Sequence, residues 1–236
     1  MRYVVPMRVD ADQDATPIFI VAGMFGNVLN LRPLSVHLGI DRRVYALQAR
    51  GLYGDDEPHQ CFEESARDYL EEMRRVQPGG PYMLAGFSGG GVTAWEMARQ
   101  LIEAGEEVAA LVMLDAIPPH PAWPEPTRFD LLHIHLQRLR ARGPVYLADW
   151  LRSRVRWELE QRRARAGAGE HARTPGEFRS ELIERGFRTA LSRYRMRTYP
   201  GDVHLFRPPL PVAYHLTGGR TANETRQLIE PNNWWR

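Results

Sequence analysis

The residues Gly86-Phe87-Ser88-Gly89-Gly90 form a Gly-x-Ser-x-Gly pattern, a spacing that can hold a reactive serine. The apolar run 82–85 before it predicts a strand, and residues 92–104 after it have the periodicity of an amphipathic helix. In such a strand-to-helix elbow the serine occupies the strained apex of the turn. Glycines flank it because a Cβ there would collide with neighbouring backbone. The pattern therefore predicts Ser88 as a nucleophile, with an ordinary glycine turn as the alternative.

A serine hydroxyl is a poor nucleophile at neutral pH and needs a base and an orienting acid. Asp115 directly follows the apolar run 108–114, which predicts the next strand of the chain. The carboxyl ends of parallel strands meet at one edge of a sheet, so we expect Asp115 and Ser88 on the same rim. We interpret Asp115 as the acid. The alternative is a helix cap or a turn residue.

Acyl transfer also needs two backbone N–H groups that stabilise the developing negative charge on the carbonyl oxygen. One is expected from Gly89, the residue after the nucleophile. The other is expected from the loop 21–27, Val-Ala-Gly-Met-Phe-Gly-Asn, and we assign it to Met24. The alternative is that Gly23 and Gly26 only make a tight turn.

The elements that must position these residues alternate between strand and helix. Apolar runs predict strands at 4–5, 18–21, 44–47, 82–85, 108–114 and 203–206, and helical spacing predicts helices at 31–38, 62–76 and 92–104. This alternation predicts a mostly parallel sheet flanked by helices. The Gly-x-Ser-x-Gly elbow within it resembles that of the α/β-hydrolases, which implies the α/β-hydrolase fold class. We expect a single domain, 1–236, whose core comprises 1–115 and 198–236. A proline-rich exit and an almost wholly helical stretch make 116–197 a predicted lid insertion.

Composition excludes several kinds of chemistry. All 31 basic residues are arginine, so lysine Schiff bases, pyridoxal phosphate and a P-loop lysine are excluded. We expect no metal and no cofactor. The net charge of +2 does not imply nucleic acid. The single Cys61, the lack of a long apolar run and the lack of an N-terminal apolar segment predict a cytoplasmic protein without a membrane span.

The charges are unevenly distributed. Between Arg128 and Arg165 there are ten arginines against four acidic residues. Such a segment is either a solvated helical face or a docking surface for an acidic partner, and the sequence leaves both interpretations open.

Several segments together resemble the thioesterase domain that ends non-ribosomal peptide and polyketide synthases. They are 18–26, 45–52, 80–82, the elbow 86–90, and 114–115. The elbow is common to all α/β-hydrolases, whereas Leu-Gln-Ala-Arg-Gly-Leu at 47–52 is more specific. The resemblance implies an acyl, peptidyl or polyketide chain delivered as a thioester on the phosphopantetheine arm of a carrier protein. Ser88 would take the acyl group, and water or an internal nucleophile would release it. Carrier proteins or upstream synthase modules would be the partners.

The family pattern also places a catalytic histidine in a loop after a final strand, followed by a C-terminal helix. Here residues 231–236 resemble the segment just before that strand. We therefore expect the last strand and helix to be missing from this chain, and the histidine to lie beyond Arg236. The eight histidines present are predicted to be surface or satisfied polar residues: His37, His59, His120, His133, His135, His171, His204 and His215.

Two other functions remain open from the sequence. The same machinery would serve a serine esterase acting on free small esters. The chain could also be a non-catalytic fragment that lacks the histidine. The sequence leaves undetermined the acyl substrate, the oligomeric state, and whether the product is a hydrolysed or a cyclised chain.

Overall fold

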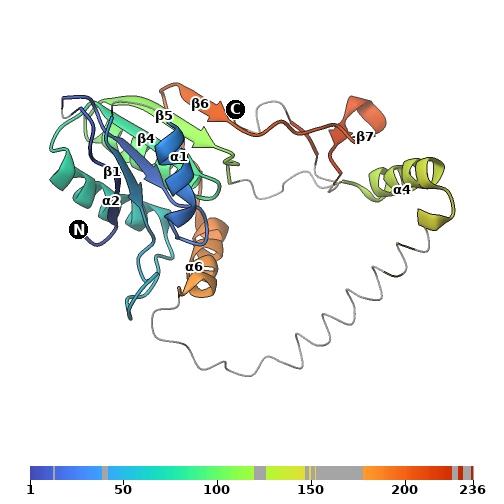
Figure 1. Ribbon diagram of the computed structural model, residues 1–236, viewed down its shortest axis with the longest axis horizontal. Helices are drawn as coiled ribbons and strands as arrows, with labels where there is room; N and C mark the ends of the chain where they lie inside the picture. Colours follow the sequence, from blue (N-terminus) through green and yellow to red (C-terminus); the bar gives the residue numbers. More distant parts are fainter. Residues whose placement is uncertain are drawn as a thin grey trace. The chain divides into compact units, whose positions relative to one another are not determined.

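A computed structural model describes residues 1–12, 14–38, 42–119, 126–146, 149, 152, 178–224, 228–230 and 235 (Figure 1). The chain forms two compact units. The first comprises Met1–Pro121, Gly176–Pro208 and Asn232–Arg236, and the second comprises Ala122–Pro175 and Pro209–Pro231. The division into a core and a 116–197 lid within one domain stays a prediction.

The first unit is built on a six-stranded sheet in the order β1-β3-β2-β4-β5-β6 (Figure 1). Strand β1 runs antiparallel to β3, and the other neighbouring strands are parallel. The mostly parallel sheet predicted from the sequence is therefore present. The strands are β1 (Val4–Arg8), β2 (Ile18–Val21), β3 (Val44–Leu47), β4 (Tyr82–Phe87), β5 (Val108–Leu114) and β6 (Val203–Phe206).

The strand order reverses direction between β2 and β4. The chain leaves β2 toward β3 on one side of the sheet, and it returns to β4 on the other side and continues outward to β5 and β6. The ends of β2 and β4 therefore form the switch point of the sheet. In open α/β sheets this switch point is the usual place for a ligand.

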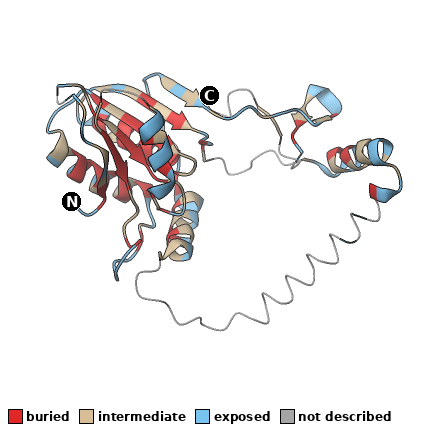
Figure 2. Cartoon of the chain, in the orientation of Figure 1, coloured by how far each residue is buried: buried red, intermediate tan, exposed pale blue. Residues whose placement is uncertain are grey.

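Helices cover both faces of the sheet. Alternation along β2 sends Phe19 and Val21 into a core shared with α2 (Phe62–Val76) and α3 (Gly90–Glu103). Ile20 faces a second core, under α1 (Arg32–His37) and the short 3₁₀ turn Leu29–Leu31. Buried residues are concentrated on the central strands and on α2 and α3 (Figure 2). Each large apolar side chain buried there contributes on the order of 1.5–3 kcal/mol.

The second unit contains α4 (Arg128–Arg142), the strands β7 (Tyr214–His215) and β8 (Thr221–Ala222), and the 3₁₀ turn Thr217–Gly219. Thr127 caps α4 in a capping box with Asp130, whose buried carboxylate also receives two hydrogen bonds from Arg220, at 2.8 and 2.9 Å. Arg138 donates to the Tyr214 hydroxyl and lies over its ring. This arginine of the basic segment therefore has a structural role within the unit.

The helical stretch predicted over 128–197 is present at its two ends, as α4 and as α6 (Ser180–Arg193). Most of the arginine-rich part between them lies outside the described residues, so the two interpretations of this segment, a solvated face and a docking surface, both stay open. His120 and His171 also lie outside them. In the part of the chain that the structure describes, no helix has the length and apolarity needed to cross a membrane.

One buried carboxylate fastens the edge of the sheet to α2. Glu72, only 4% exposed, accepts hydrogen bonds from the backbone N–H groups of Arg2, Tyr3 (2.7 Å) and Val4 (3.1 Å). Burial opposes ionisation of Glu72, but these donors outweigh it and lower its pKa. The charged form of Glu72 is therefore the one that stabilises the fold.

Replacing Glu72 by Gln should lower the free energy of unfolding by about 1–3 kcal/mol, because the amide nitrogen that replaces one carboxylate oxygen cannot accept a hydrogen bond and the remaining oxygen loses the negative charge that strengthens its bonds. The folded-state pKa is depressed, so the contribution is present above the ordinary glutamate pKa and disappears as the pH falls through the lowered value. Urea denaturation from neutral to acidic pH measures both effects.

The control for this prediction is Glu71→Gln, since Glu71 makes an exposed ion pair with Arg75 on the same helix. It should change stability by less than about 0.5 kcal/mol. Equal losses in the two variants, or a Glu72 loss that does not shrink in acid, would contradict the role given to Glu72.

Candidate active site

Ser88 occupies the turn between β4 and α3, as predicted, and is partly buried. Its φ angle is 51°, in the left-handed region that L-residues with a side chain rarely adopt. Within the described residues only Ser88 and Asp115 combine a side chain with a positive φ. Such strain costs about 1–2 kcal/mol and is concentrated at functional sites.

The elbow depends on backbone contacts that only glycine permits. A Cβ on Gly90 would overlap the carbonyl oxygens of Ala22 and Val21, the latter at 2.6 Å. A Cβ on Gly86 would lie 2.6 Å from the backbone nitrogen of Gly91. Helix α3 therefore starts directly against the ends of β2 and β4, at the switch point of the sheet.

Backbone hydrogen bonds hold Asp115 beside Ser88. The N–H of Ser88 donates to the carbonyl of Leu114, the residue before Asp115, at 2.9 Å. The N–H of Asp115 in turn donates to the carbonyl of Phe206 at 2.7 Å, which joins the end of β5 to the end of β6. Asp115 is exposed. Serine and aspartate thus lie on the same rim, at the ends of neighbouring strands.

The loop after β2 reaches the same place. It turns tightly, with the N–H of Gly26 donating to the carbonyl of Gly23 at 2.8 Å. A Cβ on Gly89 would lie 3.2 Å from the Cβ of Met24 and 2.7 Å from the ring of Phe187 on α6. The two residues assigned to the oxyanion hole are therefore neighbours.

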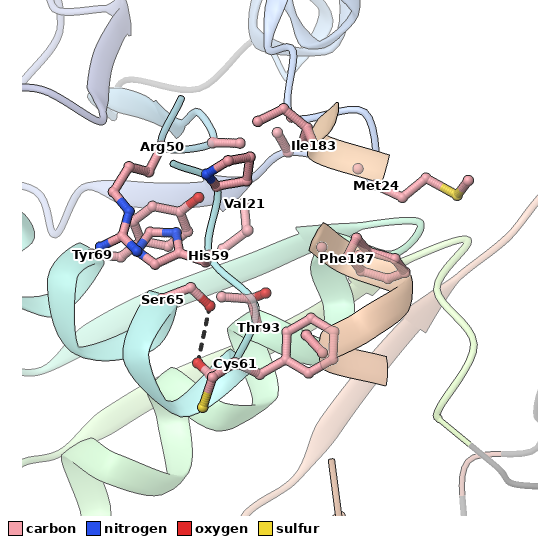
Figure 3. Close-up of a pocket in the computed structure, with 18 residues that line it drawn as sticks. Val21, Met24, Arg50, His59, Cys61, Ser65, Tyr69, Thr93, Ile183 and Phe187 are labelled. Atoms are coloured by element: carbon pink, nitrogen blue, oxygen red, sulfur yellow. Dashed lines mark hydrogen bonds between the residues drawn. The ribbon is translucent and has the colours of Figure 1, made fainter. Parts of the chain in front are cut away.

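A pocket opens beside this loop, between the ends of β2 and β3 and the helices α2, α3 and α6 (Figure 3). It was not predicted from the sequence, because its residues are scattered over more than 160 positions. Its lining comprises Val21, Ala22, Gly23, Met24, Gly26, Ala49, Arg50, Pro58, His59, Cys61, Phe62, Ser65, Tyr69, Gly90, Thr93, Ile183, Phe187 and Ala190.

A charged cluster closes one end of the pocket. Arg50 donates to Asp68 at 3.0 Å and pairs with Glu64 at 2.8 Å, and His59 is hydrogen-bonded to Asp68 at 2.9 Å. Burial lowers the pKa of His59 despite this bond, so the imidazole is neutral at pH 7. His59, Glu64 and Asp68 are close enough together to ligate a metal, but the Arg50 guanidinium already supplies the positive charge that their carboxylates need.

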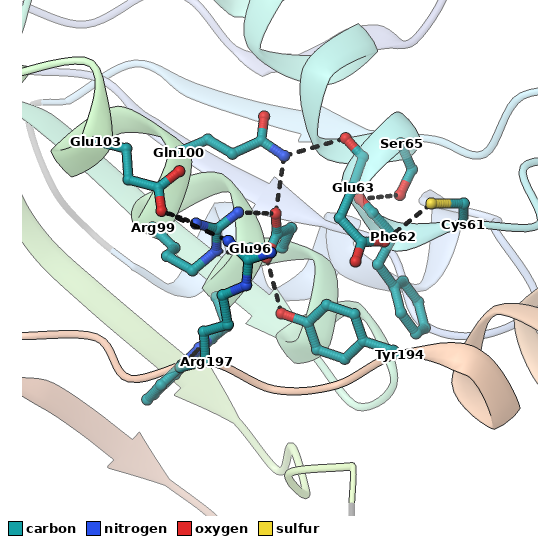
Figure 4. A network of polar contacts seen from close by, with 11 residues as sticks. Cys61, Phe62, Glu63, Ser65, Glu96, Arg99, Gln100, Glu103, Tyr194 and Arg197 are labelled. Atoms are coloured by element: carbon teal, nitrogen blue, oxygen red, sulfur yellow. Dashed lines mark hydrogen bonds and ion pairs between the residues drawn. The ribbon is translucent and has the colours of Figure 1, made fainter.

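A second cluster fixes α6 against α3 (Figure 4). Glu96, 1% exposed, accepts hydrogen bonds from Arg99, from Gln100 at 2.9 Å and from the Tyr194 hydroxyl at 2.8 Å. Burial opposes ionisation of Glu96, but these donors lower its pKa overall. Tyr194 directly follows α6, so the network holds in place the helix that carries Phe187 and Ile183.

The catalytic base stays unassigned. None of the six histidines within the described residues is hydrogen-bonded to Ser88 or Asp115. His204 lies in β6 and is exposed. His59 lines the pocket, and its side chain is hydrogen-bonded to Asp68. The expectation of a histidine beyond Arg236 stays a prediction.

The family model of the thioesterase domain matches residues 16–149, which include the elbow, Asp115 and the loop after β2. The chain belongs to the thioesterase domain family. The resemblance found in the sequence is thereby confirmed, and by family the chain is a hydrolytic enzyme.

Relatives of this thioesterase domain are parts of much longer proteins. It is 42% identical over 115 residues to a dimodular nonribosomal peptide synthase of Bacillus subtilis (strain 168), covering 49% of this chain and 5% of that protein. It is 38% identical over 117 residues to an atromentin synthetase of Tapinella panuoides, covering 50% of this chain and 12% of that protein. The chain therefore spans a small fraction of the relatives that it matches.

Solved structures confirm the predicted α/β-hydrolase fold of the domain. A four-domain nonribosomal peptide synthetase bound to AMP and glycine matches with a TM-score of 0.62 and 24% identity, covering 98% of this chain and 18% of that one. The NocB thioesterase domain in covalent complex with a fluorophosphonate nocardicin G analogue matches with a TM-score of 0.57 and 23% identity. That match covers 88% of this chain and 79% of that one.

Glycine usually makes a protein less stable than alanine does at the same position, and the strain at Ser88 predicts the opposite order there. Ser88→Gly should be more stable than Ser88→Ala by about 1 kcal/mol, because glycine adopts a φ of 51° without steric cost. Urea denaturation of the two variants measures the difference.

The control pair is Ser192→Gly and Ser192→Ala in α6, where glycine should be the less stable variant by about 0.5–1 kcal/mol. The same sign at both positions would show that the Ser88 backbone is not strained.

Proposed function

We propose that this chain is a serine thioesterase that releases an acyl, peptidyl or polyketide chain from the phosphopantetheine arm of a carrier protein. The Ser88 oxygen attacks the thioester carbonyl and gives its proton to the base. The C–S bond then breaks, the thiol of the arm leaves with a proton, and the acyl group remains as an ester on Ser88. Water, or a nucleophilic group of the bound acyl substrate, then attacks the ester carbonyl. This releases the acyl group as an acid or as a ring and restores the Ser88 hydroxyl.

The observation that carries this proposal is the joint position of Ser88 and Asp115. Both have a positive φ, and the hydrogen bond from Ser88 to Leu114 fixes their backbones next to one another. A positively charged histidine formed during attack would need a carboxylate at this rim, and Asp115 is exposed there. The role of Asp115 is therefore to orient and stabilise that histidine.

The charge that develops on the thioester oxygen also needs donors. Gly89 is the residue before the first of α3, and its N–H belongs to the unsatisfied donors at a helix N-terminus. Met24 lies beside it, in the loop after β2. We assign the oxyanion hole to these two backbone N–H groups, as the sequence suggested.

The partner follows from the same chemistry. A thioester on a flexible arm must be presented by a second protein or module, and the named relatives are synthetases of many domains. We therefore propose an acyl or peptidyl carrier protein, or an upstream synthase module, as the partner of this domain.

Where the predicted histidine is present, replacing Ser88 by Ala should lower the release of an acyl group from a carrier-bound thioester by roughly 10⁴-fold or more, and Asp115→Asn should lower it by a similar factor. Product release by liquid chromatography gives the rate. Intact-protein mass spectrometry should show the acyl group on wild type and not on Ser88→Ala.

Ser192→Ala, which removes an exposed hydroxyl on α6, is the matched control and should keep the wild-type rate. A matching free ethyl ester tests the esterase alternative, which would gain support from equal or faster ester cleavage. A wild-type chain that never carries an acyl group would favour the non-catalytic fragment.

A further inference from the structure

The pocket between α2, α3 and α6 contains two hydroxyl groups that have no hydrogen-bond partner among the described residues. Tyr69 and Thr93 are 5% and 6% exposed, and both line the pocket. Neither hydroxyl is hydrogen-bonded to any other described residue. Neither hydroxyl is among the fully enclosed unsatisfied polar atoms, so each oxygen keeps some accessible surface. An unpaired hydroxyl at a buried position costs about 1–3 kcal/mol unless something in the pocket pairs with it.

The pocket carries no free charge for an ionic ligand. The Arg50 guanidinium is occupied by Glu64, Asp68 and the carbonyl of Glu57. His59 is held by Asp68, and its lowered pKa keeps it neutral. The remaining walls are mostly apolar: Val21, Phe62, Ile183, Phe187 and Ala190. A neutral group with an apolar body and a polar tip fits this lining.

The size and position of the pocket restrict the group further. The space in it that admits water-sized groups is about 50 Å³, which suits a small substituent. Gly23 and Met24 form part of its wall, and so does Gly90, two residues after Ser88. A group in the pocket is therefore adjacent to the proposed oxyanion hole.

We propose that this pocket selects acyl groups that carry a small neutral hydrogen-bonding substituent close to the carbonyl, such as a hydroxyl or an amide, over plain alkyl acyl groups. Tyr69 and Thr93 are the specificity-determining residues, because their hydroxyls pair with that substituent. A site built to hydrogen-bond a hydroxyl rejects an analogue that lacks it far more strongly than an apolar pocket rejects a change in size. The proposal rests on the proposed thioesterase function for the identity of its ligand.

The test uses binding to Ser88→Ala, so that no turnover is required. The probes are the N-acetylcysteamine thioesters of 3-hydroxybutyrate and 3-methylbutyrate, which have the same number of non-hydrogen atoms. Titration calorimetry or NMR should give a Kd roughly tenfold lower for the hydroxyl compound, the effect of one or two hydrogen bonds. This preference should fall to about twofold or less when Tyr69→Phe and Thr93→Val are combined in the Ser88→Ala chain.

Tyr199→Phe in the same chain is the matched control, because Tyr199 is a buried phenol that packs on Trp95 outside the pocket. It should leave the preference unchanged, and thermal unfolding should show that all variants are folded. Equal binding of the two probes, binding of neither, or a preference that survives the double pocket variant would overturn the proposal. Failure of the thioesterase function is a separate result, since it would appear as an unacylated Ser88 in wild type while the binding preference persists.

Discussion

The contact of the first turn of α3 with the end of β2 is the constraint on which the rest of the site depends. A single added Cβ at Gly90 would overlap the carbonyls of Val21 and Ala22, so the helix would have to move away from the sheet. That movement would also shift Ser88, Gly89 and the loop that carries Met24. Close backbone packing at this point is therefore what fixes Ser88, Gly89 and Met24 next to one another.

The sheet supplies the second part of this arrangement. Because the strand order reverses between β2 and β4, the carboxyl ends of these strands form the switch point at which open α/β sheets usually bind ligands. Parallel pairing of β4 with β5 then places Asp115 beside Ser88. The positive φ of both residues shows that the surrounding structure imposes strained conformations at this edge and at no other described side-chain-bearing residue.

Paired carboxylates hold the periphery of the site in a fixed geometry: Glu72 and Glu96 are buried, whereas Glu64 and Asp68 are half-buried. Glu72 fastens β1 to α2, Asp68 and Glu64 hold Arg50, and Glu96 holds the end of α6. Removing one partner from such a group leaves an uncompensated polar atom in a low-dielectric environment, which is costly. These groups therefore fix the residues of the pocket walls in one arrangement, whether or not each group adds to the free energy of unfolding.

The sequence by itself determined the strands, the main helices of the first unit and the position of Ser88 at the elbow. These follow from local periodicity and from the glycines that the tight turn around Ser88 requires. It also placed Asp115 correctly at a strand end, because parallel strands share an edge. Tertiary structure alone decided the neighbours of Ser88 and the pocket, since residues such as Tyr69, Thr93 and Phe187 meet only after distant helices pack. A periodic sequence pattern predicts neither an unpaired hydroxyl nor the position of α6. Both depend on which side chains from remote segments pack into the same space.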